Sequence, residues 1–543
     1  MKSKYLFLLY HFLYLLMLVP MLSACNDDET VDTSALTLVS YTPNAGNYIF
    51  NNDTIVLNFN KKVQQSENSA ITINGKETRI IINGSTVYIH VAEPLANQVM
   101  IDIPQGALYD RSTLESFKGI QLSFFIQFQK QEVKVVDARG KGDYTRIQDA
   151  IRDVPSNNKA PYIIFVANGT YEELVDINKP YVHLVGQDWN QTIITYKTCR
   201  ISAPSAQYPD AWDYSSRNPS NINNIPEGRD GATLITAKDF YAEDISFENK
   251  WGVDEQMGPQ AEAVHTRADR IAFYHCKLRG FQDTWWTRNY TSGSSENINM
   301  RNYADNCWIE GGTDYVFGGG NLLVERSTLY NVGQQNFITA GSHMPGTQWG
   351  YVFRDCSIRG NNKAAAGSIY FGRAWQQSPI TVFINTLCLL PVHEEGWYTM
   401  SALPKLYAEY NTTANGWEVD TSKRRTTYDV SANYSESGKQ EYNVPYTGEV
   451  VLSKEKADLM NYEQIIKAND GWDPQQFYKK LASPKVTLDK GTLHWEDNKE
   501  AVCYLIFKNG NYLGKTTQTT FAVEEENATF EVKAVNRFGS LSK

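Results

Sequence analysis

The sequence predicts an all-β protein whose central part is a right-handed parallel β-helix, flanked by two small β-sandwich domains. Short apolar segments recur at nearly regular intervals through the middle of the 543-residue chain. Within each segment apolar and polar residues alternate, as in strands, and the spacing typical of helices is absent. The regions before and after this repeat have the alternation and turn residues of antiparallel hairpins.

The repeat is clearest when one small or apolar residue of each unit is taken as equivalent. The equivalent positions are Ile245, Cys276, Cys307, Ser327, Cys356 and Thr386. Their positions in the chain differ by 31, 31, 20, 29 and 30 in turn. A period of this size with β-type units indicates a solenoid in which each unit forms one coil. The three cysteines then form an interior row of free thiols that pack as small apolar groups.

The N-terminus has the features of an export signal. Lys2 and Lys4 precede an apolar run, which ends in Leu22-Ser23-Ala24-Cys25. A basic start, an apolar middle and small residues before the cut are typical of secretory signals, and the cysteine resembles that of a bacterial lipobox. We therefore expect a signal peptide at 1–24, lipidation of Cys25 and a tether at 25–34. A plain signal peptide and an uncleaved anchor remain the alternatives.

Two flanking regions are expected to be small β-sandwiches. Residues 35–129 alternate in polarity and contain the turn signals Asn74-Gly75 and Asn83-Gly84. This region resembles the bacterial Ig-like domains that precede secreted enzymes. Residues 482–543 again show strands and turns and resemble a fibronectin type III module. They are short for one, so we expect a module that is either truncated or leans on the central domain.

The central domain is expected to span residues 130–481. Asp143 stands before apolar residues with helical spacing, and this pattern predicts a helix with Asp143 as its N-cap. Such a helix would cover the exposed edge of the first coil. A second helical pattern at 454–468 predicts helices that pack on the solenoid after its last coil.

The phase of the repeat places two aspartates together. Asp283 follows Cys276 by seven residues, and Asp314 follows Cys307 by seven. Because adjacent strands lie roughly 4.8 Å apart, these carboxyl groups are expected about 5 Å apart. Two carboxylates at that distance do not both ionise easily, so one pKa should rise. The residues alone do not decide between such an acid–nucleophile pair and two turn residues at coil corners.

Charge and composition exclude several functions. The net charge of −10 becomes −12 when the two lysines of residues 1–24 are removed, which argues against a nucleic-acid partner. The sequence contains no C-x-x-C or H-x-H pair, so we expect neither a metal site nor a cofactor. Without a Gly-x-Ser-x-Gly elbow, a serine esterase is disfavoured.

Four motifs in order resemble those of pectin methylesterases (carbohydrate esterase family 8), over roughly residues 133–472. The motifs are Gln260-Ala-Glu-Ala-Val264, Gly280-Phe-Gln-Asp-Thr284, Gly312-Thr-Asp-Tyr-Val-Phe-Gly318 and Tyr370-Phe-Gly-Arg-Ala-Trp375. Any one of them alone would be a weak signal. The resemblance implies hydrolysis of methyl esters on galacturonate units of pectin.

The resemblance also implies residue roles. Asp314 would attack the ester carbonyl to give an acyl-enzyme, and Asp283 would protonate the leaving methanol and then activate water. Gln260 and Gln282 would donate to the oxyanion, although amide ladders that stack coils are the structural alternative. Arg373 would hold Asp314 ionised through two hydrogen bonds. The residues expected to contact sugar rings, with core or rim packing as the alternative for the first two, are Trp375, Phe281, Phe317 and Trp285.

Some residues depart from the family pattern. Ala374 replaces the usual Pro, Phe371 the usual Leu, and Trp285-Trp286 the usual Leu-Tyr, and the spacing from Asp283 to Asp314 is longer than usual. These changes leave the catalytic set intact but put the subsite preference in doubt. We also expect the residues 288–298 to bulge beside the site.

Two rival functions remain. A retaining glycoside hydrolase also needs two carboxylates about 5 Å apart, but the sequence lacks the Gly-His-Gly and Arg-Ile-Lys sets of polygalacturonases. A non-catalytic pectin-binding protein would also suit a solenoid between two sandwiches. For the esterase we expect pectin as the partner, no cofactor, a monomer, and attachment by lipid to the outer membrane or surface of a Gram-negative bacterium.

Overall fold

The computed structural model describes residues 34–43, 48–50, 53–92, 98–201, 203–215, 231–287, 298–333, 336–524 and 527–543. The predicted signal peptide, Cys25 and nearly all of the predicted bulge at 288–298 lie outside these residues. The chain forms two compact units, the first built from residues before 124 and the second mainly from residues 124–543.

The N-terminal β-rich region contains antiparallel pairs, as the alternation predicted. Its four-stranded sheet has the order β1-β3-β8-β7, with β1 at Leu38–Thr42, β3 at Thr54–Phe59, β8 at Thr86–His90 and β7 at Ile80–Asn83. A two-stranded sheet pairs β10 (Leu108–Asp110) with β4 (Val63–Gln65). A five-stranded sheet has the order β2-β11-β9-β5-β6, with β2 at Tyr48–Phe50, β11 at Ile120–Gln127, β9 at Gln98–Ile103, β5 at Thr72–Ile73 and β6 at Lys76–Glu77.

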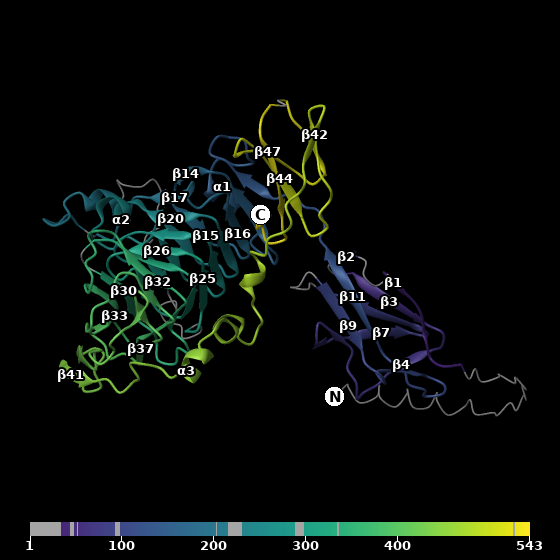
Figure 1. Ribbon diagram of the computed structural model, residues 1–543, viewed down its shortest axis with the longest axis horizontal. Helices are drawn as coiled ribbons and strands as arrows, with labels where there is room; N and C mark the ends of the chain where they lie inside the picture. The colour runs from purple at the N-terminus through teal and green to yellow at the C-terminus, as the bar shows by residue number, and fades with distance from the viewer. Residues whose placement is uncertain are drawn as a thin grey trace, which may run out of the picture. The chain divides into compact units, whose positions relative to one another are not determined.

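Three long sheets make up the central domain, and successive coils contribute one strand to each (Figure 1). The first sheet contains β12 (Lys134–Val136), β13 (Tyr162–Val166), β16 (Val182–Gly186), β19 (Phe240–Glu243), β22 (Ile271–Tyr274), β25 (Arg301–Asp305), β28 (Asn321–Glu325), β31 (Tyr351–Arg354), β34 (Ile380–Ile384) and β37 (Leu406–Tyr410). The second contains β14 (Gly169–Glu172), β17 (Thr192–Tyr196), β20 (Ser246–Asn249), β23 (Lys277–Arg279), β26 (Trp308–Gly311), β29 (Thr328–Asn331), β32 (Ser357–Gly360), β35 (Leu387–Cys388), β38 (Thr413–Ala414) and β39 (Trp417–Glu418). The third contains β15 (Val175–Ile177), β18 (Thr233–Ile235), β21 (Val264–Thr266), β24 (Trp285–Thr287), β27 (Val316–Gly318), β30 (Asn336–Gly341), β33 (Ile369–Ala374) and β36 (Trp397–Tyr398).

The strand registers confirm the predicted parallel β-helix and its period. In the first sheet Phe240 pairs with Ile271, and Ile271 with Asn302, both in parallel. These pairs have the same offset as the first two steps between the equivalent positions of the repeat. The next three steps along this sheet, from β25 through β28 and β31 to β34, have the offsets of the steps from Cys307 to Thr386. Each predicted unit is therefore one coil.

One corner of the coil uses left-handed backbone in every turn. The residue before each repeat marker has a positive φ of 48–56°, as in Asp244, His275, Asn306, Arg326, Asp355 and Asn385. Asn and Asp tolerate this conformation better than most residues. Their side chains also connect coils, since Asn385 Nδ2 donates to Asp355 Oδ1 at 2.8 Å.

Apolar side chains from the three sheets fill the interior of the solenoid in one continuous cluster. Cys276, Cys307 and Cys356 belong to this cluster, and all six described cysteines are free and buried. The Cys276 N–H donates to Cys307 Sγ at 3.5 Å, and the Cys307 N–H donates to Ser327 Oγ at 2.9 Å. The predicted interior row of thiols is therefore confirmed.

The predicted helix before the first coils exists, but its predicted N-cap is wrong. Helix α1 spans Ile147–Arg152, and its N-cap residue Arg146 makes no side-chain capping bond. Asp143 instead accepts a hydrogen bond from the Val135 N–H at 2.8 Å. The Glu173 carboxylate accepts from the N–H groups of Ile147 (2.8 Å) and Gln148 (3.0 Å), so a residue from the following coil satisfies the helix end.

The segment after the last coil covers the outer face of the first sheet. It contains α3 (Lys454–Leu459), η2 (Glu463–Lys467) and η3 (Pro474–Gln476). Arg301 of β25 donates to the Ile466 carbonyl at 2.9 Å and to Asp470, which attaches this segment to the sheet. A short antiparallel pair, β40 (Thr427–Val430) and β41 (Glu441–Pro445), precedes it.

Within the described residues, no helix has the length and hydropathy of a membrane span.

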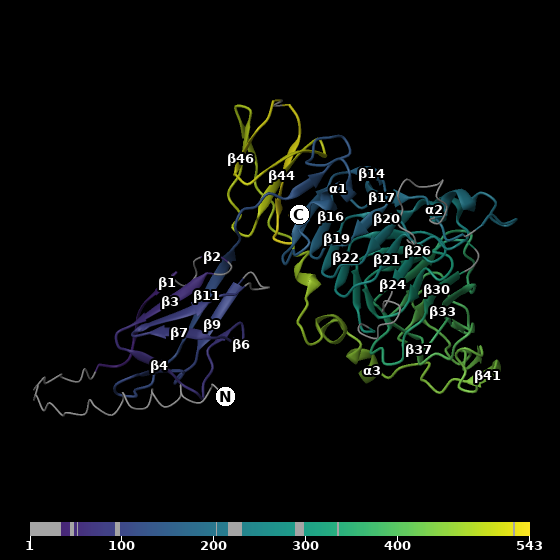
Figure 2. The ribbon, with the colours of Figure 1, turned by 180° about the vertical axis from the view of Figure 1, so that it is seen from behind.

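Two three-stranded antiparallel sheets end the chain. Their orders are β42-β43-β46 and β45-β44-β47, with β42 at Thr487–Asp489, β43 at Thr492–His494, β46 at Thr520–Ala522, β45 at Asn511–Thr516, β44 at Cys503–Lys508 and β47 at Phe530–Val535. This module leans on the first coils, as expected: Lys515 pairs with Asp143 at 2.6 Å, and Phe507 packs edge-on against Phe165 at 5.9 Å. Figure 2 shows this module, with β44 on its nearer side, next to the first coils.

Candidate active site

The two predicted carboxylates lie at the corner between the second and third sheets on successive coils. On the two sides of the corner Lys277 pairs with Trp308 and Trp285 pairs with Val316. Asp283 and Asp314 each stand two positions before the members of the second pair, and the Asp283 N–H donates to the Thr313 carbonyl at 3.0 Å. Both aspartates have positive φ, 64° and 50°. The register therefore stacks them as predicted, and they are also corner residues, so the two interpretations of the sequence are compatible.

Arg373 holds only one of the two carboxylates. Its Nε donates to Asp314 Oδ1 at 2.8 Å, and its second terminal nitrogen donates to Asp314 Oδ2 at 2.5 Å. Arg373 comes from β33, two coils beyond Asp314, and its guanidinium also lies 4.6 Å from the centre of the Phe337 ring. This two-pronged contact fixes the orientation of the Asp314 carboxylate and favours its charged form.

Burial and charge separate the two carboxyl groups. Burial raises the pKa of Asp283 well above its usual value, and the Asp314 and Glu262 charges raise it further, against the opposing effect of Arg200 and Arg373. Burial also raises the pKa of Asp314, but Arg373 opposes this through both its charge and its hydrogen bonds. Since the pair holds a single proton most easily, the proton belongs on Asp283, and Asp314 remains a carboxylate.

The two glutamines lie beside the dyad. Gln282 precedes Asp283 and pairs with Thr313 in an isolated parallel bridge, and its carbonyl accepts from the Ala261 N–H, next to Gln260. A Cβ at Gly258 would lie 2.6 Å from Gln282 Oε1 and 2.8 Å from the Tyr208 hydroxyl, so the glycine is what allows this amide to fit. Gln260 and Gln282 thus lie next to the dyad along the backbone, and the oxyanion role of their amides stays a prediction.

The outer face of the third sheet carries a row of side chains that includes Arg373. The register runs from His265 through Trp286, Phe317 and Ala340 to Arg373. His265 stacks on Trp286 at 4.0 Å, Trp286 on Phe317 at 5.3 Å, and Phe317 contacts Trp375 at 5.8 Å. A row of packed rings therefore runs along this face; His265 and Phe317 are buried, and Trp286 and Trp375 are half-buried.

The prediction that Trp285 contacts substrate is wrong. Its side chain is fully buried in the solenoid core, edge-on to Phe273 at 5.4 Å. Because successive residues of a strand point to opposite faces, and because Trp286 pairs with Phe317, the outward residue is Trp286. The sequence held this signal: the repeat makes Trp285 equivalent to Val316 rather than to Phe317, so Trp285 and Phe317 cannot both point outward.

Phe281 and Phe317 are almost completely buried, at 5% and 3% exposure. The Phe281 ring packs over two glycines, and a Cβ at Gly312 or Gly333 would lie 2.4 Å or 2.7 Å from its Cε2. Phe281 therefore packs against the backbone of the following coils, in agreement with the core alternative that the sequence left open.

Two charged residues near the dyad were not selected by sequence reasoning. Glu262, inside the first motif, is 1% exposed, and its Oε1 lies 3.6 Å from an Arg200 terminal nitrogen. The Arg200 guanidinium also lies 5.3 Å from the centre of the Trp286 ring. The sequence did show a glutamate between two alanines inside a motif without other charged residues, and this was the feature that could have pointed to Glu262.

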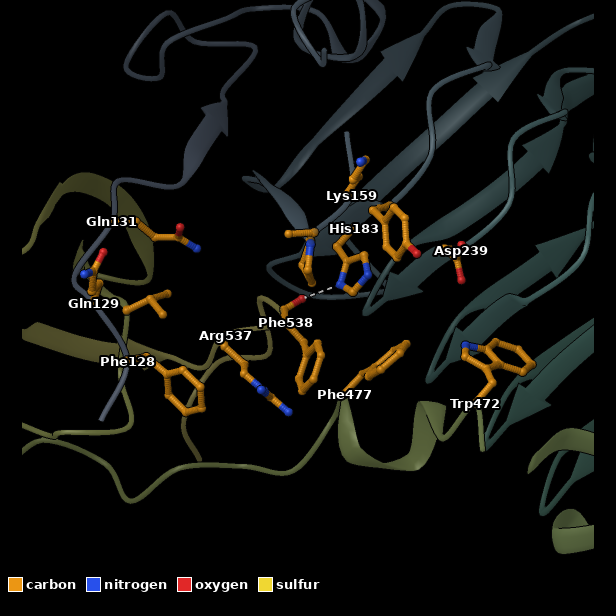
Figure 3. Close-up of a pocket in the computed structure, with 14 residues that line it drawn as sticks. Phe128, Gln129, Gln131, Lys159, His183, Asp239, Trp472, Phe477, Arg537 and Phe538 are labelled. Atoms are coloured by element: carbon orange, nitrogen blue, oxygen red, sulfur yellow. Dashed lines mark hydrogen bonds between the residues drawn. The ribbon is translucent and has the colours of Figure 1, made fainter. Parts of the chain in front are cut away.

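A separate cavity of about 370 Å³ lies between the first coils and the C-terminal module. Figure 3 shows Arg537 beside Phe128 and Phe538, and the His183 ring bonded to the Phe538 carbonyl at 2.9 Å. Burial lowers the pKa of His183 to about 4, so this imidazole is neutral at physiological pH. The aromatic side chains that line the cavity pack on one another, as Phe477 and Phe538 do at 4.5 Å. Asp239, which also lines the cavity, pairs with Arg270. This cavity offers no counterpart to the carboxylate dyad.

Sequence comparison gives the same residues a family context. The family model described as Pectinesterase matches residues 133–210 and 220–447, more than half of the chain. "Pectinesterase 31" of Arabidopsis thaliana is 30% identical over 266 residues, which cover 48% of this chain and 75% of that protein. "Putative pectinesterase/pectinesterase inhibitor 22" of the same plant is 29% identical, and the match spans 47% of its length, so the chain covers about half of this relative.

Solved structures with a similar chain path include "Pectin methylesterase from Carrot", at 22% identity and a TM-score of 0.49, covering 64% of this chain and 97% of that one. "Pectin methylesterase PemA from Erwinia chrysanthemi" matches at 19% identity and a TM-score of 0.46, covering 64% and 99%. The parallel β-helix itself is given by the registers described above.

Proposed function

The chain belongs to the pectinesterase family, and from this premise we propose that it hydrolyses the methyl esters of galacturonate units in pectin. Methanol and de-esterified pectate are the products. The observation that carries the proposal is the unequal pair of stacked carboxylates, of which only Asp314 is held by Arg373.

In the proposed first step, an Asp314 oxygen attacks the C6 carbonyl of the ester. A bond forms between that oxygen and C6, the bond from C6 to the methoxy oxygen breaks, and Asp283 gives its proton to the departing methanol. The amides of Gln260 and Gln282 would donate to the oxyanion, and donors of this kind are worth roughly 3–4 kcal/mol in the transition state.

In the second step, the Asp283 carboxylate takes a proton from water as the water oxygen attacks C6. The bond from C6 to Asp314 breaks, the new carboxyl group leaves, and both aspartates return to their starting states. One residue thus acts first as acid and then as base, which requires a raised pKa. The raised pKa of Asp283 supports this assignment.

Asp314→Asn tests the nucleophile. Methanol release from a highly methylated pectin should fall to background while circular dichroism and Tm stay unchanged. Asp355→Asn is a matched control, because Asp355 is also a corner residue with positive φ (55°) and lies on another coil; it should retain activity. If Asp314→Asn kept the parent rate, Asp314 would not be the nucleophile. New reducing ends without methanol would instead indicate a glycoside hydrolase.

The proposal extends to the rest of the chain. We propose an exported lipoprotein, acylated at Cys25 and anchored to the outer membrane or surface of a Gram-negative bacterium, which acts as a monomer. The basic and apolar residues of 1–24 support the signal peptide. The antiparallel strand pairs in the regions that precede and follow the solenoid in the chain support an Ig-like spacer and a fibronectin type III-like module. Metabolic labelling with a palmitate analogue, compared between the parent and Cys25→Ala, tests the anchor.

A further inference from the structure

Glu262 belongs to the same ladder as the two aspartates. In the third sheet Val264 pairs with Trp285, and Trp285 pairs with Val316. The residues two positions earlier on these three coils are Glu262, Asp283 and Asp314. Backbone bonds continue this register into the corner, since the Ala261 N–H donates to the Gln282 carbonyl at 3.1 Å and the Ala263 N–H to the Thr284 carbonyl at 2.9 Å. Asp283 is therefore the middle one of three carboxyl-bearing positions.

The three positions differ in their counterions. Arg373 holds Asp314 by two hydrogen bonds, and an Arg200 nitrogen lies 3.6 Å from Glu262. No salt bridge to Asp283 occurs within the described part of the chain. Nor is any set of three His, Cys, Asp or Glu side chains arranged there as metal ligands. The ladder therefore consists of two carboxylates, each near an arginine, on either side of a carboxyl group that exchanges a proton.

The proposed reaction changes the charge on one side of Asp283 only. When Asp314 becomes acylated it is neutral, so its negative charge no longer acts on Asp283. The Asp283 carboxylate must accept a proton from water at that stage, and the loss of a neighbouring negative charge makes it a weaker base. Glu262, on the opposite side, takes no part in bond formation, and the Arg200 nitrogen 3.6 Å away is its counterion in both steps.

We propose that Glu262 is a positioning residue for charge, a fixed carboxylate that supports Asp283 as the base in the hydrolysis of the acyl-enzyme. The inference rests on the proposed esterase function. The charged groups around Asp283 are Asp314, Glu262, Arg200 and Arg373, and the two carboxylates act in the direction opposite to the two arginines. The Glu262 charge also acts on Cys199. Burial and this charge together raise the pKa of the Cys199 thiol to about 12.

Glu262→Gln removes the fixed charge with little change in shape. The basic limb of kcat/KM, which reports loss of the Asp283 proton in the free enzyme, should move to lower pH by roughly one unit. Hydrolysis of the acyl-enzyme should slow by about tenfold while its formation does not, so a burst of about one methanol per enzyme should precede the steady state. Glu262→Asp, which keeps the charge, should restore the parent profile.

Arg200→Gln provides a test of opposite sign. Arg200 opposes the effect of the carboxylates on Asp283, so its removal should move the basic limb to higher pH. Glu248→Gln is the matched control. Glu248, on β20 and outside the ladder, is a buried carboxylate paired with Arg279 of β23, and this variant should leave the pH profile and the steady-state rate as they are.

The outcomes separate the two proposals. A parent protein that releases no methanol from pectin would refute the esterase function itself. A folded Glu262→Gln variant with the parent basic limb and no burst would overturn the role of Glu262 alone. Should that variant fail to fold, the double variant Glu262→Gln/Arg200→Gln, which removes both charges, is compared with Arg200→Gln: a basic limb at lower pH in the double variant supports the role of Glu262, and an equal or higher one overturns it.

Discussion

Replacing Arg373 by alanine should remove most of the esterase activity, because Asp314 loses the two hydrogen bonds that hold its carboxylate. The guanidinium gives two hydrogen bonds to Asp314, at 2.8 Å and 2.5 Å, from a site where Asp314 is 6% exposed. Hydrogen bonds to charged groups contribute about 1.5–3 kcal/mol each. Losing both should therefore cost the ionised nucleophile about 3–6 kcal/mol, which corresponds to a fall of about 10²–10⁴-fold in kcat.

The same variant should shift the pH profile in a defined direction. Arg373 lowers the pKa of both aspartates, so its removal raises both. The acid limb of kcat/KM, where Asp314 gains a proton, and the basic limb, where Asp283 loses one, should both move to higher pH. Arg373→Lys keeps the charge but loses the planar two-pronged contact, and should lie between the parent and the alanine variant.

Methanol release measured from pH 4 to 9 on one methylated pectin gives both quantities. Arg326→Ala is the matched control, because Arg326 makes a similar two-pronged contact to Asp305 away from the dyad, with its Nε 2.9 Å from Oδ1 and a terminal nitrogen 2.8 Å from Oδ2. The control should keep its activity per folded molecule. If Arg373→Ala kept a kcat within threefold of the parent and an unmoved acid limb, Arg373 would not be what keeps Asp314 ionised.

Three further predictions follow from the surroundings of the dyad. Trp286→Ala should raise KM for pectin and leave Tm nearly unchanged, whereas Trp285→Ala should lower stability by about 3–5 kcal/mol, because only Trp285 is core; equal effects in calorimetry and kinetics would contradict the assigned faces. Gly312→Ala should lower Tm, because its Cβ would lie 2.4 Å from the Phe281 ring; an unchanged Tm would show that the ring can move. Methanol release should not respond to EDTA, and a rate restored only by added calcium would contradict an aspartate-only mechanism.

The sequence predicted the arrangement of coils because the repeat carries two independent kinds of information. The spacing of equivalent small residues gives the length of each coil, and the two-residue alternation gives the face of each side chain. Even the short spacing between Cys307 and Ser327 was visible in the sequence. It equals the offset between paired residues of β25 and β28. The stacking of Asp283 and Asp314 followed from the phase alone.

Other features depended on residues far apart in the chain. The free N–H groups at the N-terminus of α1 donate to the Glu173 carboxylate, 26 residues beyond Ile147. The prediction that the nearby Asp143 caps this helix was therefore wrong. The pairing of Arg373 with Asp314 spans 59 residues. It was expected only from the resemblance to the family, because no local pattern states which charged side chains meet across coils.

By itself, the sequence determined the solenoid, its register and the stacking of two carboxyl groups, because a parallel coil repeats its side-chain directions at every turn. The tertiary structure decided which carboxyl group carries the proton, since this depends on burial and on where Arg373, Arg200 and Glu262 place their charges. Electrostatic interactions act through space rather than along the chain, so the two aspartates, equivalent in the repeat, become an acid and a nucleophile only in the folded protein.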